Sequence, residues 1–391
     1  MILKCSIIAI SFLFASVAVY AQEARGRVRD FGIQIGILET GRYNAITDVQ
    51  GVKVGHTTLI EGSDIRTGVT AIIPHGGNIF QNKVPAAVYV GNGFGKSMGL
   101  SQIKELGNIE TPILLTNTLN APLVANAVID YVLAQTGNEK VKSVNTMVGE
   151  TNDGGLNDIR GRHVTAEHVI ESIRNAHSGL VKEGNVGAGT GTECLGFKGG
   201  IGTSSRRLPI SKGGYTVGVL VQTNFGGVLD INGAPVGREL NNFYMRDPKN
   251  NYKADGSCMI IIATDAPLSA RNLERLAKRS YLAFGNVGSF SSNGSGDYSV
   301  AFSTYAGNRI SHESEGQILS LTELKNDAMS PLFMAVWEAT EEAILNSMFM
   351  ATDMKGANNS FLPALPIKQT LEIMNKYNAL NYDRLPKAMR D

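Results

Sequence analysis

Gly256 and Ser257 stand at the boundary between a polar segment and a fully apolar run, within the stretch "YKADGSCMIIIATDAPLS". A serine hydroxyl is a poor nucleophile, and it becomes reactive only when a base lies within hydrogen-bond reach. No GxSxG motif surrounds Ser257, and no histidine is close to it in the sequence. The structural alternative is that Gly256 makes a turn and Ser257 opens a buried strand.

A base becomes available without any other residue if the chain is cut immediately before Ser257. The free α-amine of the new terminus has a pKa near 8, so a good fraction of it is neutral and can take the hydroxyl proton. The cut could be autocatalytic, with the Ser257 hydroxyl attacking the Gly256 carbonyl and water resolving the resulting ester. Glycine suits this position, and the preceding segment "MRDPKNNYKADG" is polar, so a cut there would not tear a core.

Composition excludes several classes of function. The 391 residues carry a formal charge of +1 and contain no charge block or low-complexity linker, which argues against a nucleic-acid-binding surface. The 3 cysteines and 6 histidines form neither CxxC nor HExxH, so we expect no metal site. Two glycine-rich stretches miss the nucleotide-binding patterns, because Val90 and Thr192 stand where glycines are needed.

The first 21 residues have the pattern of a secretory signal peptide. Lys4 provides a positive charge, Ile7–Tyr20 are almost entirely apolar, and Ala21 fits the position before a cleavage site. The apolar run is short for a membrane-spanning helix, so an uncleaved anchor is the less favoured alternative. We therefore expect a periplasmic or secreted protein, without stable membrane insertion after signal removal, in which residues 22–391 form a single catalytic domain.

Strand and helix patterns are spread over this domain. Apolar runs rich in Val, Ile and Tyr predict strands, and they occupy residues 68–75, 86–91, 143–150, 215–226, 258–265 and 297–305. Apolar residues at spacings of three and four predict helices within residues 121–137, 165–177, 269–285 and 330–352. In the third helix we expect Leu273, Leu276 and Leu282 on one face and Gly285 at the end. These elements suggest two stacked sheets with helices outside, in four layers.

The stretch "FKGGIGTSSR", Phe197–Arg206, allows two interpretations. Its flexible residues before two serines and an arginine are compatible with a hairpin loop that exposes Arg206. The alternative is a functional role for this loop, which the residue types do not specify. The sequence alone favours neither.

At this point the chain resembles the DmpA/BapA-type aminopeptidases, the L-aminopeptidase/D-esterase or β-peptidyl aminopeptidase family. The motifs that carry the resemblance occur in one order over essentially the whole mature chain, and they are "GVTAIIPH", "ETNDGGLND", "GTECLGFKGGIGTSSR", "VQTNFG", "GSCMIIIATDAPL" and "GSGDYSVAFST". The resemblance implies an α+β fold, a four-layer αββα sandwich like that of the N-terminal-nucleophile hydrolases. It also implies self-cleavage into an α chain, residues 22–256, and a β chain, residues 257–391, and a homo-oligomer of αβ units.

The resemblance also implies catalytic roles for four residues. Ser257 matches the family's nucleophile, and Asn224 in "VQTNFG" matches the asparagine whose side-chain amide binds the oxyanion. Ser295 and Asp297 in "GSGDYS" match a serine and an acidic residue that orient the nucleophile and its amine. Family members carry Glu at the acidic position, and Asp is one methylene shorter, which affects its direct contact with the amine.

Substrate recognition is implied in the same way. Glu150 in "GETND" matches the carboxylate that receives the free amino group of the substrate, and such a charge selects N-terminal residues over internal ones. We expect Asn152 and Leu156 in the pocket walls. Gly154 and Gly155 suggest a roomy rim, which favours small N-terminal residues such as alanyl or β-alanyl groups.

The expected activity is that of a serine aminopeptidase which acts on short peptides, amides or esters through a Ser257 acyl-enzyme, without a metal or cofactor. Three alternatives remain at this stage. One is a β-peptidyl aminopeptidase specialised for β-amino acids, and another is an acyltransferase similar to ornithine acetyltransferase. The third is an inactive scaffold that binds peptides, which the Asp297 departure would permit.

Overall fold

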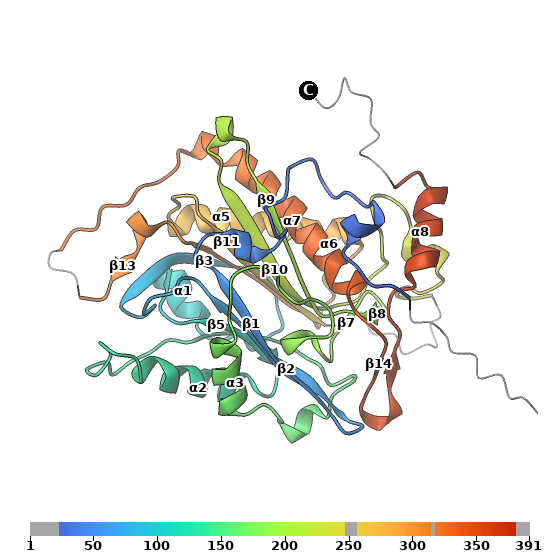
Figure 1. The fold of residues 1–391 in the computed structure, drawn as a ribbon, viewed down its shortest axis with the longest axis horizontal. Helices are drawn as coiled ribbons and strands as arrows, with labels where there is room; N and C mark the ends of the chain where they lie inside the picture. The colour runs from blue at the N-terminus through green and yellow to red at the C-terminus, as the bar shows by residue number, and fades with distance from the viewer. Residues whose placement is uncertain (1–22, 247–255, 314–316, 381–391) are drawn as a thin grey trace, which may run out of the picture.

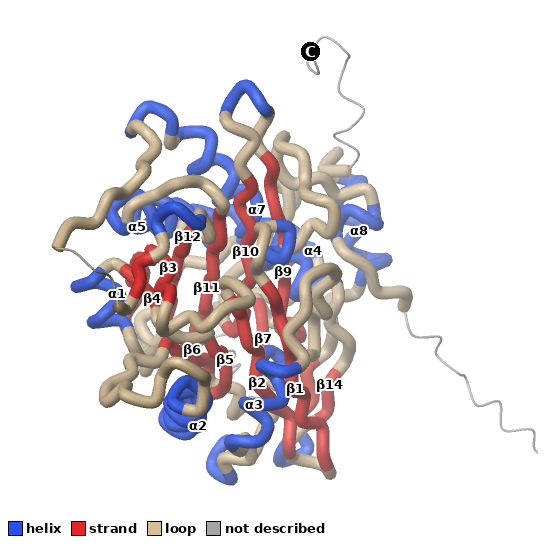
Figure 2. Tube along the Cα trace, turned by 60° about the vertical axis from the view of Figure 1, so that its left-hand side comes forward, coloured by secondary structure: helices blue, strands red, loops and turns tan. Residues whose placement is uncertain are grey.

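The computed structural model describes residues 23–246, 256–313 and 317–380. The predicted signal peptide, residues 1–21, lies outside the described residues, as does most of the polar segment before Gly256. Two stacked sheets with helices on both outer faces form the described part of the chain (Figures 1 and 2). None of the described helices is long and apolar enough to cross a membrane.

The first sheet has four strands in the order β1-β2-β5-β6. Its strands are β1 (Lys53–Glu61), β2 (Ile65–Ile73), β5 (Ile113–Asn117) and β6 (Met147–Thr151). The β5–β6 pair is parallel, whereas β1–β2 and β2–β5 are antiparallel.

The second sheet has the strand order β13-β3-β12-β11-β10-β9, with β4 beside β3. Its strands are β3 (Asn82–Gly93), β4 (Asn108–Ile109), β9 (Ile201–Arg207), β10 (Thr216–Asn224), β11 (Ser257–Thr264), β12 (Gly296–Ser303) and β13 (Ile310–Ser311). The β11–β12 pair is parallel, and β11 runs antiparallel to β10. Two short hairpins flank the sheets, formed by β7 (Glu193–Cys194) with β8 (Phe197–Lys198) and by β14 (Met354–Lys355) with β15 (Phe361–Leu362).

Helices cover the two outer faces, so the layer order is helices, sheet, sheet, helices. The helices are α1 (Leu100–Leu106), α2 (Ala121–Leu133), α3 (Ala166–Arg174), α4 (Val236–Glu239), α5 (Ala270–Ser280), α6 (Leu282–Val287), α7 (Ser330–Phe349) and α8 (Ile367–Lys376). α2 and α3 pack on the first sheet, where Val128 and Val169 meet Leu114 of β5 in one buried cluster. α5, α6 and α7 pack on the second sheet. This architecture is the predicted αββα sandwich.

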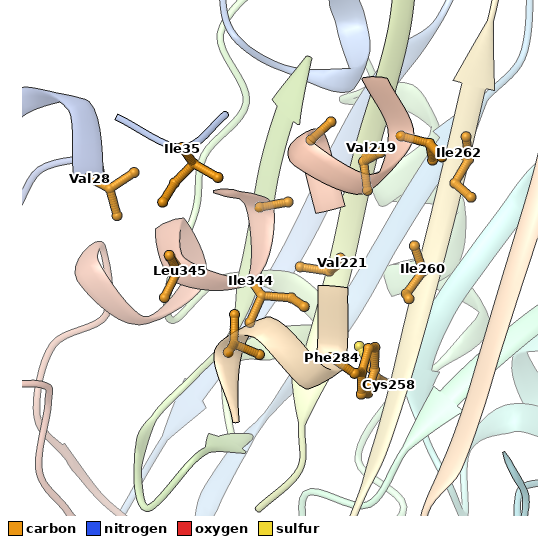
Figure 3. Close-up of a cluster of buried hydrophobic side chains, with 14 of the residues drawn as sticks. Val28, Ile35, Val219, Val221, Cys258, Ile260, Ile262, Phe284, Ile344 and Leu345 are labelled. Carbon is orange, nitrogen blue, oxygen red and sulfur yellow. The ribbon is translucent and has the colours of Figure 1, made fainter. Parts of the chain in front are cut away.

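Strand β11 shows why its sequence is an unbroken apolar run. Side chains alternate along a strand, and both faces of β11 are buried. Cys258, Ile260 and Ile262 face the helices, in the cluster drawn in Figure 3. Met259 and Ile261 face the other sheet. Since side chains on either face are buried, the residues between Ser257 and Thr264, at the two ends of the strand, are all apolar.

Arg206 is completely buried in β9, so the interpretation of "FKGGIGTSSR" as a loop with an exposed arginine is wrong. Its guanidinium pairs with Glu338 at 2.9 Å and with Glu342 at 2.7 Å, both in α7. Burial alone would raise the pKa of Glu342, but the charges of Arg206 and Arg29 hold this pKa below its usual value. The pairs attach α7 to the edge strand of the second sheet.

The helix expected from Ser269 to Gly285 is two helices. α5 ends at Ser280, and α6 continues through Gly285 to Val287. Leu273 and Leu276 are buried as expected, but Leu282 is 63% exposed. The expectation for Leu282 was wrong because the break near Tyr281 changes the direction of the helix face, which the apolar spacing does not reveal. Ser269 does cap α5, since its hydroxyl accepts a hydrogen bond from the Asn272 N–H.

Candidate active site

Ser257 is the first residue of the central strand β11, between the last residue of β10 and the first residue of β12. It lies opposite Asn224 on one side and opposite Gly296 on the other. Its hydroxyl donates a hydrogen bond of 2.5 Å to the Gly256 carbonyl oxygen, which also accepts one of 3.1 Å from the Gly296 N–H. The register of three strands therefore places the serine hydroxyl beside the carbonyl of the preceding residue.

The glycine before Ser257 has a steric cause. A Cβ at Gly256 would lie 1.9 Å from the backbone oxygen of Asn224, a separation that no side chain can adopt. A residue larger than glycine would push the β10–β11 ladder apart at the position of the nucleophile. The choice of residue before Ser257 is thus restricted by close backbone approach rather than by a positive φ.

The side-chain amide of Asn224 is fixed from two directions. Its Nδ2 donates to the Asn152 carbonyl oxygen at 2.9 Å, and its Oδ1 accepts from the Glu193 N–H at 3.1 Å. An amide nitrogen carries two hydrogens, and within the described ranges only one of those on Asn224 has an acceptor, so the other N–H can donate to a ligand. Asn224 is thus a rigid hydrogen-bond donor next to Ser257.

Ser295 and Asp297 form a hydrogen-bonded pair at the start of β12. The Ser295 hydroxyl donates to Asp297 Oδ1 at 2.7 Å, and both residues are buried. Burial raises the pKa of Asp297 to about 6, against the effect of hydrogen bonds from Ser295, Tyr281 and the Cys258 backbone. In the described parts of the chain neither residue hydrogen-bonds to the Ser257 side chain. Asp297 instead lies opposite Cys258 in the β11–β12 ladder, and Cys258 is the residue that follows Ser257.

Glu150 lies at the end of β6, in the other sheet, and it is 2% exposed. Its Oε1 accepts a hydrogen bond of 2.8 Å from the Lys96 N–H, and its Oε2 accepts one from the Thr118 hydroxyl. A carboxylate has about four acceptor positions, so these two bonds leave room for a further donor. Glu150 is therefore a carboxylate held in place and able to receive one more hydrogen bond.

A cavity of about 620 Å³, which we name the Ser257 cavity, brings these groups together. It is bounded by both sheets and by loops, and its lining residues are Phe94, Lys96, Thr118, Glu150, Asn152, Gly155, Leu156, Gly191, Glu193, Asn224, Phe225, Gly226, Gly256, Ser257, Gly294, Ser360, Phe361 and Leu362. Three of the residues singled out for the site from the sequence do not line the cavity: Ser295, Asp297 and Gly154. The others line it, and they are Glu150, Asn152, Gly155, Leu156, Asn224, Gly256 and Ser257. A hydroxyl, an amide donor and a carboxylate around one cavity can bind an ammonium group and present a carbonyl to a nucleophile.

Several lining residues were not found from the sequence. Phe361 and Leu362 belong to the β14–β15 hairpin, which reaches the cavity only through tertiary packing and carries no motif. Glu193 lies within the motif "GTECLGFKGGIGTSSR", but its spacing from other residues did not mark it as part of the site. Burial raises the pKa of Glu193 to about 7, although the nearby charge of Lys198 acts in the opposite direction.

Among the described residues no group of three or more His, Cys, Asp or Glu side chains could hold a metal ion. Cys194 and Cys258 are free and buried. Burial raises the pKa of both thiols far above the neutral range, so both remain protonated and unreactive.

Comparisons with known proteins agree with this geometry. The model of peptidase family S58 matches residues 44–361. A beta-peptidyl aminopeptidase BapA of Sphingosinicella microcystinivorans is 40% identical over 389 residues, which cover 92% of this chain and 95% of the relative.

Solved structures show the same likeness over 90% of this chain and 99% of theirs. A Burkholderia sp. beta-aminopeptidase is 40% identical with a TM-score of 0.83. An L-aminopeptidase D-Ala-esterase/amidase of Ochrobactrum anthropi, described as a prototype of the serine aminopeptidases and a variant of the Ntn hydrolase fold, is 35% identical with a TM-score of 0.83.

Proposed function

We propose, from the premise that this chain belongs to peptidase family S58 and is a serine aminopeptidase, that it releases small N-terminal residues from short peptides, amides or esters through an acyl-enzyme on Ser257. One observation carries the proposal: the Ser257 hydroxyl, the Asn224 amide and the Glu150 carboxylate line a single cavity. The family assignment also decides against the acyltransferase and scaffold alternatives.

The first step of the proposed mechanism is self-cleavage. The Ser257 oxygen attacks the Gly256 carbonyl carbon, the C–N bond breaks, and the nitrogen of Ser257 takes up the hydroxyl proton. Water then hydrolyses the ester to a Gly256 carboxylate and a free Ser257 with an α-amine. The 2.5 Å hydrogen bond between the hydroxyl and the Gly256 oxygen supports this step, because it brings the two reacting groups together.

The freed amine then acts as the base in each turnover. It takes the proton of the Ser257 hydroxyl while the oxygen attacks the substrate carbonyl, and the unused N–H of Asn224 donates to the oxyanion. The ammonium gives its proton to the leaving group, and water releases the N-terminal residue from the ester. Asp297, near the Ser257 nitrogen, stabilises the ammonium form, and Ser295 orients that carboxylate.

Glu150 gives the reaction its exopeptidase character. Its carboxylate binds the free ammonium group of the substrate, and such a charge-assisted contact rejects peptides with a blocked amino terminus. The distance between Glu150 and Ser257 sets the backbone length that reaches the nucleophile. Leu156 and Asn152 border the space between them.

A second candidate is specialisation for β-amino acids, since relatives at about 40% identity are named beta-peptidyl aminopeptidases. Turnover of L-Ala, D-Ala and β-Ala p-nitroanilides, measured side by side, separates the two. A strong preference for a bulky aromatic N-terminal residue would contradict the proposed preference for small residues.

The processing test uses a denaturing gel with mass spectrometry. The mature protein should give two fragments, residues 22–256 and residues 257–391, and Ser257→Ala should stay one chain. Ser211→Ala, at an exposed serine, is the matched control and should be cut normally. Full activity in an uncut wild-type chain would contradict the mechanism.

Export and assembly belong to the same proposal. We infer cleavage after Ala21, a periplasmic or secreted location, and a homo-oligomer of αβ units. The signal pattern of residues 1–21 supports export. N-terminal sequencing of the exported protein tests the first inference, with Gln22 expected, and light scattering tests the assembly.

A further inference from the structure

The Ser257 cavity contains a second carboxylate, Glu193, that the proposed mechanism does not use. Glu193 is half-buried in the short strand β7 and lines the cavity. Within the described residues no group hydrogen-bonds to its carboxylate oxygens, in contrast to Glu150, which has two protein donors. Acidic groups removed from bulk water normally have a partner, so a carboxylate without one on a cavity wall is suited to a donor from a ligand.

The position of Glu193 relative to the reaction follows from Asn224. The backbone N–H of Glu193 donates to one end of the Asn224 amide, and the other end donates to the carbonyl of Asn152. Asn152 follows closely on Glu150 at the end of β6. The backbone segments that carry the two carboxylates therefore lie at opposite ends of the Asn224 amide. Because Glu150 takes the substrate's amino end in the proposed mechanism, we assign the Glu193 end of this amide to the leaving group.

The loop that carries Glu193 is held rigidly by a buried lysine. Lys198 Nζ donates to the carbonyl oxygens of Gly189, Thr192 and Gly199, at distances from 2.8 to 3.0 Å. Its three donors are thus used by the backbone of this loop. No ion pair neutralises Glu193 among the described residues. The backbone that carries Glu193 is thus held in place, and its carboxylate retains its capacity to interact with a ligand.

We propose that Glu193 selects the leaving group: it accepts hydrogen bonds from N–H donors beyond the scissile bond and repels a free carboxylate there. The favoured substrates are then aminoacyl amides and peptides whose second residue ends in an amide or continues into a longer chain. Dipeptides with a free C-terminal carboxylate are disfavoured. This inference rests on the proposed function, because it needs the acyl-enzyme on Ser257 to define the leaving-group side.

The expected discrimination follows from Coulomb's law. Two carboxylates about 6 Å apart, at an effective dielectric constant of about 40, repel by an energy that corresponds to about a tenfold change in kcat/KM. The assay runs at pH 8.5, since burial raises the pKa of Glu193 to about 7 and the carboxylate is ionised above it.

The test compares alanylglycinamide with alanylglycine, with L-Ala or β-Ala as the N-terminal residue, whichever the enzyme turns over faster. The wild-type ratio of kcat/KM, amide over acid, should be about 10 or more. In Glu193→Gln the ratio should fall to within about twofold of 1, and in Glu193→Asp, which keeps the charge, it should stay well above that of Glu193→Gln. Since the backbone N–H is unchanged, the contact to Asn224 persists in both variants.

Glu171→Gln, at an exposed glutamate of α3, is the matched control and should keep the wild-type ratio and activity. A wild-type ratio near 1, or a ratio that Glu193→Gln leaves unchanged, would overturn the assignment of Glu193. Failure of the proposed function looks different, because the wild-type enzyme would then turn over neither substrate, nor alanine p-nitroanilide.

Discussion

Replacing Asp297 with asparagine should make the uncut protein more stable at neutral pH. The carboxylate is buried, and its pKa in the folded chain is about 6 instead of 3.8. The folded state therefore binds the Asp297 proton more tightly than the unfolded state. The free energy of unfolding therefore falls as the pH rises from about 4 to 6. Above the pKa of Asp297 in the folded state, the full cost of burying its charge is present. Asparagine is neutral at all these values, so it removes the penalty.

The magnitude follows from the two pKa values. A shift from 3.8 to about 6 corresponds to about 3 kcal/mol at pH 8, and the same values leave about 1 kcal/mol at pH 4.5. For 391 residues, at about 2.1 cal/mol/K per residue, the unfolding entropy near Tm is about 0.8 kcal/mol/K. The expected gain in Tm is therefore about 4 °C at pH 8 and about 1 °C at pH 4.5.

The measurement is a thermal melt of Ser257→Ala and of Ser257→Ala with Asp297→Asn. The Ser257→Ala background is used because we expect it to remain a single chain, without a free ammonium group that would change the titration of Asp297. Asp64→Asn, at an exposed position, is the control and should show no such gain. A gain that is absent at pH 8, or equal at both pH values, would refute the reasoning. In the Ser257 chain the same substitution should lower kcat by roughly 10²-fold, because the amine loses its carboxylate.

Three further outcomes are expected. Asn224→Ala should lower kcat by roughly 10²- to 10³-fold in a chain that is still cut, since one oxyanion donor is lost; an unchanged kcat would exclude this role. Glu150→Gln should raise KM for alanine p-nitroanilide by roughly tenfold or more while the KM of an N-acetylated analogue stays unchanged, and equal effects on both would show that Glu150 does not bind the amino group. Treatment with a chelator should leave the rate of p-nitroanilide hydrolysis unchanged, and strong inhibition that added metal reverses would contradict a metal-free mechanism.

The sequence predicted the middle strands of the second sheet, β3, β12, β11 and β10, but not β9 and β13 at its edges or the short β4. β10, β11 and β12 are buried on both faces, so their apolar runs are unmistakable. In the first sheet, β1 and β5 were not predicted, for different reasons. Lys53–Glu61 mixes charged, polar and apolar residues, and Ile113–Asn117 is too short for a clear pattern. Strand patterns depend on burial and on length, so a strand of mixed exposure such as β1 and a short buried strand such as β5 both give weak signals.

The residues of the candidate site also divide into those that the sequence identified and those that only the structure places there. Ser257, Asn224 and Glu150 lie at strand ends within long motifs, and the sequence was sufficient to select them. Glu193 and Phe361 reach the cavity through a short hairpin each, and their proximity depends on how the hairpins pack rather than on local sequence. Glu150 and Ser257 lie in different sheets, so the distance between them cannot be predicted from their spacing along the chain.

The place of Ser257 at the beginning of a central strand changes what a cut would mean for folding. β11 is hydrogen-bonded along its whole length to β10 on one edge and β12 on the other, and all of its residues are buried. After a cut before Ser257, the two fragments would contribute to the same hydrophobic core, and separating them would expose that core to water. Unfolding of the cut protein would then yield two molecules instead of one, so refolding would become a second-order reaction that slows on dilution. The uncut chain folds by a first-order process, so the peptide bond before Ser257 makes folding independent of concentration, whereas the folded protein does not need it to remain native.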